Sequence, residues 1–191
     1  MAYDRIPVTV TWAKDRVLLV FERTCDLVNM IDLVIDDSLY ENIANIYVEG
    51  GGQRFDKFYN KTQIETTAAI FGRKVSRCDG LTMVPLAMAP FYETNLVMPS
   101  TEHHKLELVI YFSRPVDELA KEVQLYGNRY FLSPGDRDRL VNKGHEFVTY
   151  QSQYTGEEKI KKGINKIRLH FTHPCILIYF WGMGLSLCCP Q

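Results

Sequence analysis

The stretch Tyr40-Glu-Asn-Ile-Ala-Asn-Ile-Tyr-Val-Glu-Gly-Gly-Gly-Gln-Arg-Phe-Asp-Lys57 decides the fold of this chain. Ile46 and Val48 alternate with Tyr47 and Glu49, which is the two-residue period of a β-strand. Three glycines follow, and they permit backbone angles that residues with a side chain avoid. The pattern predicts a strand that ends in a bulge, a tight corner or a site of close packing, after which a short polar segment turns the chain back.

Length and composition indicate one β-rich domain. The chain has 191 residues, enough for one substantial core, and no linker-like stretch divides it. Hydrophobic residues make up 46%, with 11 Tyr and 10 Phe, which excludes a disordered chain and favours sheets. The net charge of −1 offers no electrostatic footprint for nucleic acid or for an anionic membrane. We therefore expect protein partners.

The cysteines and the N-terminus indicate a protein that stays inside a cell, or inside something assembled there. The five cysteines are scattered and contain no Cys-x-x-Cys pair, so neither zinc binding nor thioredoxin-like chemistry is indicated. Reduced thiols are expected. The first residues lack the basic and apolar regions of a secretory signal.

Further strands are predicted on both sides of the glycine stretch. They cover residues 6–12, 17–21, 30–35, 43–49, 81–89, 104–112, 147–154 and 164–171. In 104–112 the pattern places Leu106, Leu108, Ile110 and Phe112 in the core. Pro85 and Pro90 make 81–89 an edge strand or an irregular crossover.

One helix is predicted, over Thr62–Phe71, with Asn60 or Thr62 as its cap and Gly72 as its end. Residues 116–126 fit either a strand or a helical turn, and the charged residues 133–145 predict a loop. The apolar stretch Cys175–Cys189 is about 15 residues long, short of the roughly 20 that span a bilayer as a helix. A buried or interface strand is the preferred interpretation, and a membrane anchor is the alternative.

Together these elements predict an all-β fold, an antiparallel sandwich of about eight strands with one short helix. A single jelly roll that covers residues 1–191 as one domain fits best. Strand number alone leaves an immunoglobulin-like or a lectin-like sandwich open.

Four segments resemble the major capsid proteins of nucleocytoplasmic large DNA viruses, in order and spacing, over roughly residues 15 to 181. Phe21–Leu27 is similar to a strand that ends in arginine before an Asp-Leu pair. Val48–Lys57 is similar to the Gly-Gly-Gln-x-Ile-Asp segment, with Phe55 at the aliphatic position and one extra glycine. The motif residues are Gly50, Gly51, Gly52, Gln53, Asp56 and Lys57.

The third segment runs from Thr82–Leu86 through Leu96–Pro99 to His104–Leu108, and it resembles paired Pro-Leu segments before a His-x-Val/Leu-x-Leu/Ile strand. The fourth, Leu169–Pro174 followed by Leu177–Trp181, resembles a Phe-Asn-His-Pro run before an apolar strand with tryptophan. It contributes His173 and Pro174, and Thr172 stands where asparagine is common in that family.

The resemblance implies a structural capsid protein. Subunits of that family carry two jelly rolls, the matching motifs belong to the first, and this chain is expected to be a single-roll relative. Single rolls in such viruses serve as penton proteins at five-fold vertices or as minor, cementing components under the shell. The implied partners are further copies, as a homo-pentamer, and a major capsid protein, with end loops 72–80 and 133–145 in contact. The implied location is the virion, assembled in host cytoplasm.

No enzyme, cofactor or metal site is predicted. His103 and His104 are adjacent and point to opposite faces of a strand, and His170 and His173 likewise diverge. The His-x-His spacing of an enzymatic cupin is absent, as are a Gly-x-Ser-x-Gly elbow and a P-loop after the glycines. The abundant tyrosines leave a carbohydrate-binding jelly roll as an alternative, and a cupin enzyme ranks third. Nucleic acid is not an expected partner, and membrane contact stays an alternative.

Overall fold

The computed structural model describes residues 2–88, 91, 96–98, 104–116, 121–142, 159, 161–170, 174–175 and 178. The chain divides into two compact units, Met1–Ser152 and Gln153–Gln191. All strands and helices of the described residues lie in the first unit. The proposal that all 191 residues form one domain stays a prediction.

The first unit is a sandwich of two antiparallel sheets. Sheet 1 has the strand order β1-β11-β4-β8-β7, and β9 pairs with β4 outside this path. Its strands are β1 (Ala2–Ile6), β4 (Leu27–Asp36), β7 (Ser76–Cys78), β8 (Leu81–Pro85), β9 (Leu96–Val97) and β11 (Val123–Tyr130). All of its pairs are antiparallel.

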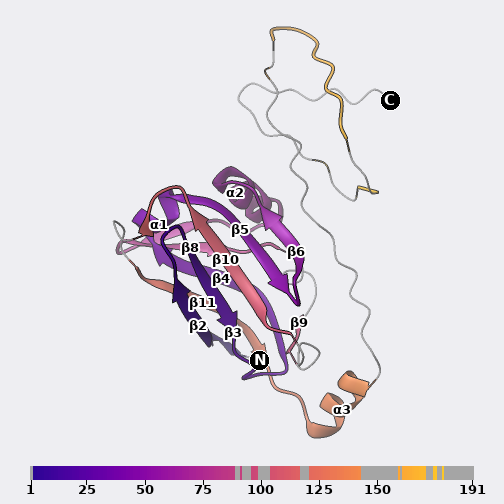
Figure 1. Cartoon of the computed structure of the whole chain (residues 1–191). Coiled ribbons are helices and arrows are strands. Elements are labelled where there is room, and N and C mark those ends of the chain that lie inside the picture. The colour runs from indigo at the N-terminus through magenta and orange to yellow at the C-terminus, as the bar shows by residue number, and fades with distance from the viewer. Residues whose placement is uncertain are drawn as a thin grey trace. The chain divides into compact units, whose positions relative to one another are not determined.

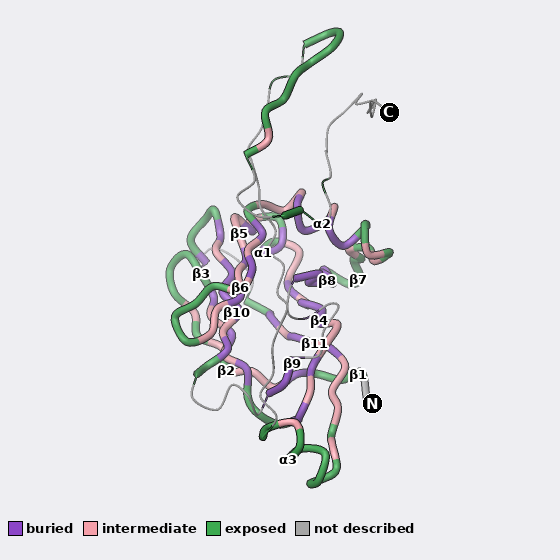
Figure 2. Tube along the Cα trace, turned by 90° about the vertical axis from the view of Figure 1, so that its right-hand side faces the viewer, coloured by how far each residue is buried: buried purple, intermediate pink, exposed green. Residues whose placement is uncertain are grey.

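Sheet 2 has the strand order β2-β3-β10-β5-β6, again antiparallel throughout. Its strands are β2 (Val8–Trp12), β3 (Arg16–Phe21), β5 (Ile43–Gly50), β6 (Gln53–Phe58) and β10 (Leu106–Phe112). Figures 1 and 2 show the two sheets as facing layers, with the helices at the two ends of the roll. The predicted antiparallel sandwich is therefore confirmed.

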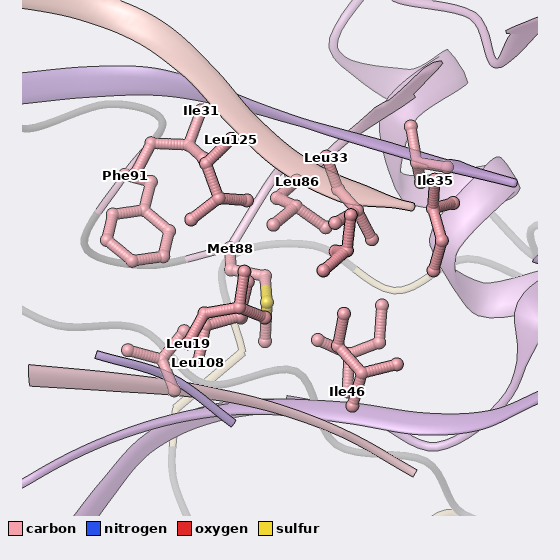
Figure 3. Packing of buried hydrophobic residues seen from close by; sticks show 14 of the residues in the cluster. Leu19, Ile31, Leu33, Ile35, Ile46, Leu86, Met88, Phe91, Leu108 and Leu125 are labelled. Atoms are coloured by element: carbon pink, nitrogen blue, oxygen red, sulfur yellow. The ribbon is translucent and has the colours of Figure 1, made fainter. Parts of the chain in front are cut away.

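The core lies between the two layers, where apolar side chains of both sheets meet. Leu106, Leu108, Ile110 and Phe112 are all buried, as the alternation in β10 predicts. Figure 3 shows Leu19 and Leu108 of sheet 2 opposite Ile31 and Leu125 of sheet 1, with Met88 between them. These residues form one continuous apolar cluster.

Several predicted strands differ from the observed ones. The strand predicted over 6–12 is interrupted at Pro7, so β1 and β2 belong to different sheets. The edge assignment of 81–89 is wrong, because β8 pairs with both β4 and β7. Pro85 is tolerated there because it is the last residue of the strand.

The ambiguous region 116–126 contributes to a strand, β11. The strand predicted over 164–171 is wrong for the described residues 164–170, which form neither strand nor helix. The strand predicted over 147–154 lies outside the described residues, as does most of the stretch 175–189.

The predicted helix is α2 (Lys61–Ile70), and its cap is Asn60, whose side chain accepts a hydrogen bond from the Gln63 amide at 2.8 Å. Gly72 ends it with φ of 72°. Two further helices were missed, α1 (Asp37–Glu41) and α3 (Pro134–Asn142). Helix α1 is too short for a periodic pattern, and α3 has no buried face to reveal it.

Candidate functional site

The glycine stretch forms a β-hairpin between β5 and β6. Gly50 pairs with Gln53, so Gly51 and Gly52 are the two turn residues. Their φ angles are 60° and 78°. Positive φ at both central residues is the feature of a type I′ turn, whose twist matches that of the adjoining strands. The glycines therefore permit a tight corner rather than a phosphate-binding loop.

Close packing explains a second part of the glycine requirement. A Cβ atom on Gly51 would lie 2.8 Å from Cγ of His104, and one on Gly50 would lie 2.8 Å from the Phe55 ring. A Cβ atom on Gly52 would meet nothing within 4 Å. The ladder is also irregular next to the turn, because Phe55 has no partner on β5. This bulge and the turn together set the direction of the hairpin.

We expect Gly51→Ala to destabilise the fold more than Gly52→Ala does. Both substitutions place a side chain at positive φ, which costs about 1 kcal/mol. Gly51→Ala adds the contact with His104, so its total is about 2 kcal/mol. Urea unfolding measures both free energies. In a His104→Ala background the two variants should become equal, and a persistent difference would contradict the packing argument.

The other motif residues of the hairpin differ in exposure. Asp56 is only 2% exposed, and its carboxylate accepts a hydrogen bond from the Lys57 amide at 2.8 Å. The Lys57 ammonium lies 4.6 Å from the centroid of the Tyr59 ring. Gln53 is exposed. Their proposed role is architectural, as it is for the glycines.

The last two motif residues, His173 and Pro174, belong to the second unit. Pro174 is exposed. His173 lies outside the described residues.

Asp26 is a structural residue that the sequence did not single out, although it lies in the segment Phe21–Leu27. Its carboxylate is 4% exposed and accepts hydrogen bonds from Nε of Arg137 at 2.7 Å and from the Leu132 amide at 2.7 Å. Nη2 of Arg137 adds a third bond, at 3.1 Å. Because no residue of α3 is buried, this bidentate pair is a main attachment of α3 to the roll.

These contacts set the charge state of Asp26. Burial by itself would raise the pKa of the carboxyl group. The hydrogen bonds from Arg137 and Leu132, with the guanidinium charge, outweigh burial and hold the pKa below its ordinary value of 3.8. A carboxyl group with a lowered pKa stabilises the folded state above its ordinary pKa. That contribution disappears as the pH falls through the lowered value.

We therefore expect Asp26→Asn to cost about 1.5 kcal/mol at pH 7 and less at pH 3, below the ordinary pKa of the carboxyl group. Urea unfolding of both proteins at the two pH values measures the difference. Arg137→Gln is the companion variant. It removes the cation of the Asp26 pair, so its cost should depend on pH in the same way. A difference that stays constant with pH would contradict the assignment.

A second buried carboxylate, Asp32, lies on the outer side of sheet 1. It is 0% exposed, and its Oδ2 accepts hydrogen bonds from the Tyr3 hydroxyl at 2.6 Å and from Nη2 of Arg73 at 2.8 Å. Burial and the neighbouring Asp32 carboxylate raise the pKa of Tyr3. The cluster ties the first strand and the segment after α2 to the middle of β4.

The described residues offer no arrangement for metal chemistry or for membrane spanning. Among them, no group of three or more His, Cys, Asp or Glu side chains is placed to hold a metal ion. None of the helices in the described part of the chain is both long enough and apolar enough to cross a bilayer. The groups that the geometry does bring together, the hairpin and the two buried carboxylates, hold strands and loops in place.

Comparison with known proteins points to viral capsids. No protein-family model matches the chain. A major capsid protein of Chrysochromulina ericina virus is 41% identical over 51 residues, which cover 27% of this chain and 9% of that protein. A major capsid protein of Pyramimonas orientalis virus is 25% identical over 164 residues, covering 69% of this chain and 40% of the relative. Capsid protein 1 of Acanthamoeba polyphaga mimivirus is 38% identical over 60 residues, covering 31% and 10%.

Solved capsid structures share the fold. A chain of the quasi-atomic model of the PBCV-1 virus capsid aligns with a TM-score of 0.59 at 19% identity, covering 78% of this chain and 47% of that chain. A PBCV-1 crystal structure fitted into a reconstruction of the virophage Sputnik gives 0.57 at 18% identity, with the same coverage. This chain thus spans less than half the length of the relatives it matches.

The observed sandwich is the jelly roll that the sequence predicts, because its two antiparallel sheets superpose on those capsid subunits. The sequence matches name the same class of protein. In sequence and in fold, this chain is therefore related to the capsid proteins of nucleocytoplasmic large DNA viruses.

Proposed function

We propose that this chain is a structural, non-enzymatic component of an icosahedral viral capsid and forms the penton at the five-fold vertices. The observation that carries the proposal is a roll with its own core. Both sheets and one continuous apolar cluster are contained in residues 2–142. Such a roll is rigid enough to act as a building block without a second roll to complete its core.

The sequence similarity supports the choice of a shell role. The motifs resemble those of a first jelly roll, and the relatives are named major capsid proteins. A homo-pentamer at the vertex would contact copies of itself and a neighbouring major capsid protein. A closed ring of five copies uses heterologous contacts, in which each subunit offers two different surfaces. The proposed location is the virion, with assembly in host cytoplasm.

A cryo-EM reconstruction of the virion that contains this chain tests the position. We expect density for the roll at the five-fold vertices. Density between capsomers under the shell would instead support a minor, cementing component, and absence from the shell would contradict both roles.

The purified chain provides a second test. Light scattering coupled to size exclusion should show a pentamer of the 22.1 kDa chain. A protein that stays monomeric at all accessible concentrations would contradict the penton proposal.

A further inference from the structure

We propose that the outer face of sheet 2 packs against the outer face of sheet 1 of the next copy, in a head-to-tail ring. The inference rests on the proposed function, because it names the two surfaces that such a ring would use. The outer face of sheet 2 is called the front face and that of sheet 1 the back face. In Figures 1 and 2 the described helices lie at the ends of the roll and not over either face.

The front face has an apolar and aromatic centre. Strand β10 turns Leu108 and Ile110 inward, so Val109 and Tyr111 point outward. Val109 is only 5% exposed, because the ladder places the half-buried Leu18 and Tyr47 on either side of it. The rings of Tyr47 and Tyr111 stack, with centroids 6.1 Å apart. The outer side of an antiparallel sheet is ordinarily polar. Tyrosine and arginine around an apolar centre are typical of protein interfaces.

The back face has a comparable centre. The rings of Tyr3 and Tyr126 stack at 6.3 Å, and Val34 lies on the same outward side of β4. The neighbouring buried charge of Asp32 is paired with Arg73, so it does not repel an apolar partner. Each face therefore presents an aromatic pair next to aliphatic side chains.

Charged residues lie at both ends of each face, and the sign of the charge at the α1 end differs between the two faces. On the front face, Arg16 lies at the α1 end, beside Tyr111, and its guanidinium donates to the Tyr111 hydroxyl at 2.6 Å. Glu107 lies four residues before Tyr111 on β10, at the end of the face near the hairpin, opposite Glu49 on β5. Arg54, whose guanidinium is 4.1 Å from the Tyr47 centroid, balances one of the two carboxylates. Lys57 lies opposite Tyr47 on β6 and adds a positive charge at the level of Val109. The front face is thus positive at the α1 end and in its middle, and Glu107 leaves one uncompensated carboxylate toward the hairpin.

The back face shows the reverse order with the same spacing. Asp36 and Glu122 lie at its α1 end, where the Glu122 amide donates to Asp36. Arg5 pairs with Tyr126 at the level of Asp32, four residues along β4 from Asp36. Four residues of strand correspond to about 13 Å on both faces. In a ring whose axis runs along the strands, the α1 end of one copy lies beside the α1 end of the next. Arg16 of one copy then faces Asp36 and Glu122 of its neighbour. At the other end, Glu49 and Glu107 face Arg5 of the neighbour.

A charge swap on the full chain tests the assignment. Arg16→Glu and Glu122→Arg each place like charges together, and each should raise the concentration for half-assembly at least tenfold, measured by mass photometry and sedimentation. The double variant should recover most of the loss. Arg139→Glu compares the faces with the end loop 133–145, because its side chain is 80% exposed on α3. An assembly loss in this variant but not in the face variants would support loop contacts and contradict the face-to-face packing. Thermal unfolding verifies that each variant is folded.

The outcomes separate this inference from the proposed function. If the wild-type chain forms a ring and Arg16→Glu assembles equally well, the face-to-face packing is wrong and the penton role stands. The same holds if the double variant does not restore the assembly that each single variant loses. A wild-type chain that forms no ring would contradict both.

Discussion

Leu108→Ala is expected to lower the free energy of unfolding by about 3 kcal/mol. Leu108 is 0% exposed on β10, the central strand of sheet 2, and its side chain lies between the two sheets (Figure 3). Truncation removes buried methyl groups and leaves a cavity that the paired neighbours β3 and β5 cannot close. Urea unfolding followed by circular dichroism measures the loss.

Leu108→Met is the matched control for that experiment. It keeps the volume of the side chain, so its cost should stay below about 1.5 kcal/mol. If Leu108→Ala were no more costly than Leu108→Met, the site would be loosely packed, and the view of a single core shared by both sheets would be wrong.

Arg73→Met should destabilise the protein by about 3 kcal/mol at neutral pH. The substitution keeps an unbranched apolar stem and removes the guanidinium charge that compensates Asp32, which is 0% exposed. The Tyr3 hydroxyl still donates to the carboxylate, but one neutral donor does not replace a guanidinium. Chemical unfolding at pH 7 provides the measurement.

The double variant Asp32→Asn/Arg73→Met tests the cause. With the carboxylate gone there is no buried charge to compensate, so the double variant should be more stable than Arg73→Met alone. Equal stability of the two proteins would show that the loss arises from the packing of the Arg73 side chain and not from its charge.

Sequence patterns predicted those parts of the fold that depend on neighbours along the chain. The alternation in 104–112 placed four core residues correctly, and the glycines identified the corner that the structure shows as a hairpin turn. Asn60 and Gly72 marked the two ends of α2 because capping is a local interaction. Helix α3 was missed as a helix because its residues are all exposed or partly exposed and no buried face marks it.

The candidate site was predicted only where its residues are neighbours along the chain. The hairpin residues Gly50–Lys57 are consecutive, so their proximity follows from the turn. Asp26 lay within a recognised segment, yet its partner Arg137 is 111 positions away, and no pattern along the chain links the two. The contact of Gly51 with His104 was invisible for the same reason.

By itself, the sequence determined the class of fold, the glycine corner, the main core strand and the relationship to viral capsid proteins. Only the tertiary structure decided which buried carboxylates are compensated, and by which cations, because Asp32 and Arg73 are 41 positions apart. It also decided which side chains gather on the outer faces of the sheets. Those faces are set by the register between strands, and register depends on pairing across the whole roll, which local periodicity does not specify.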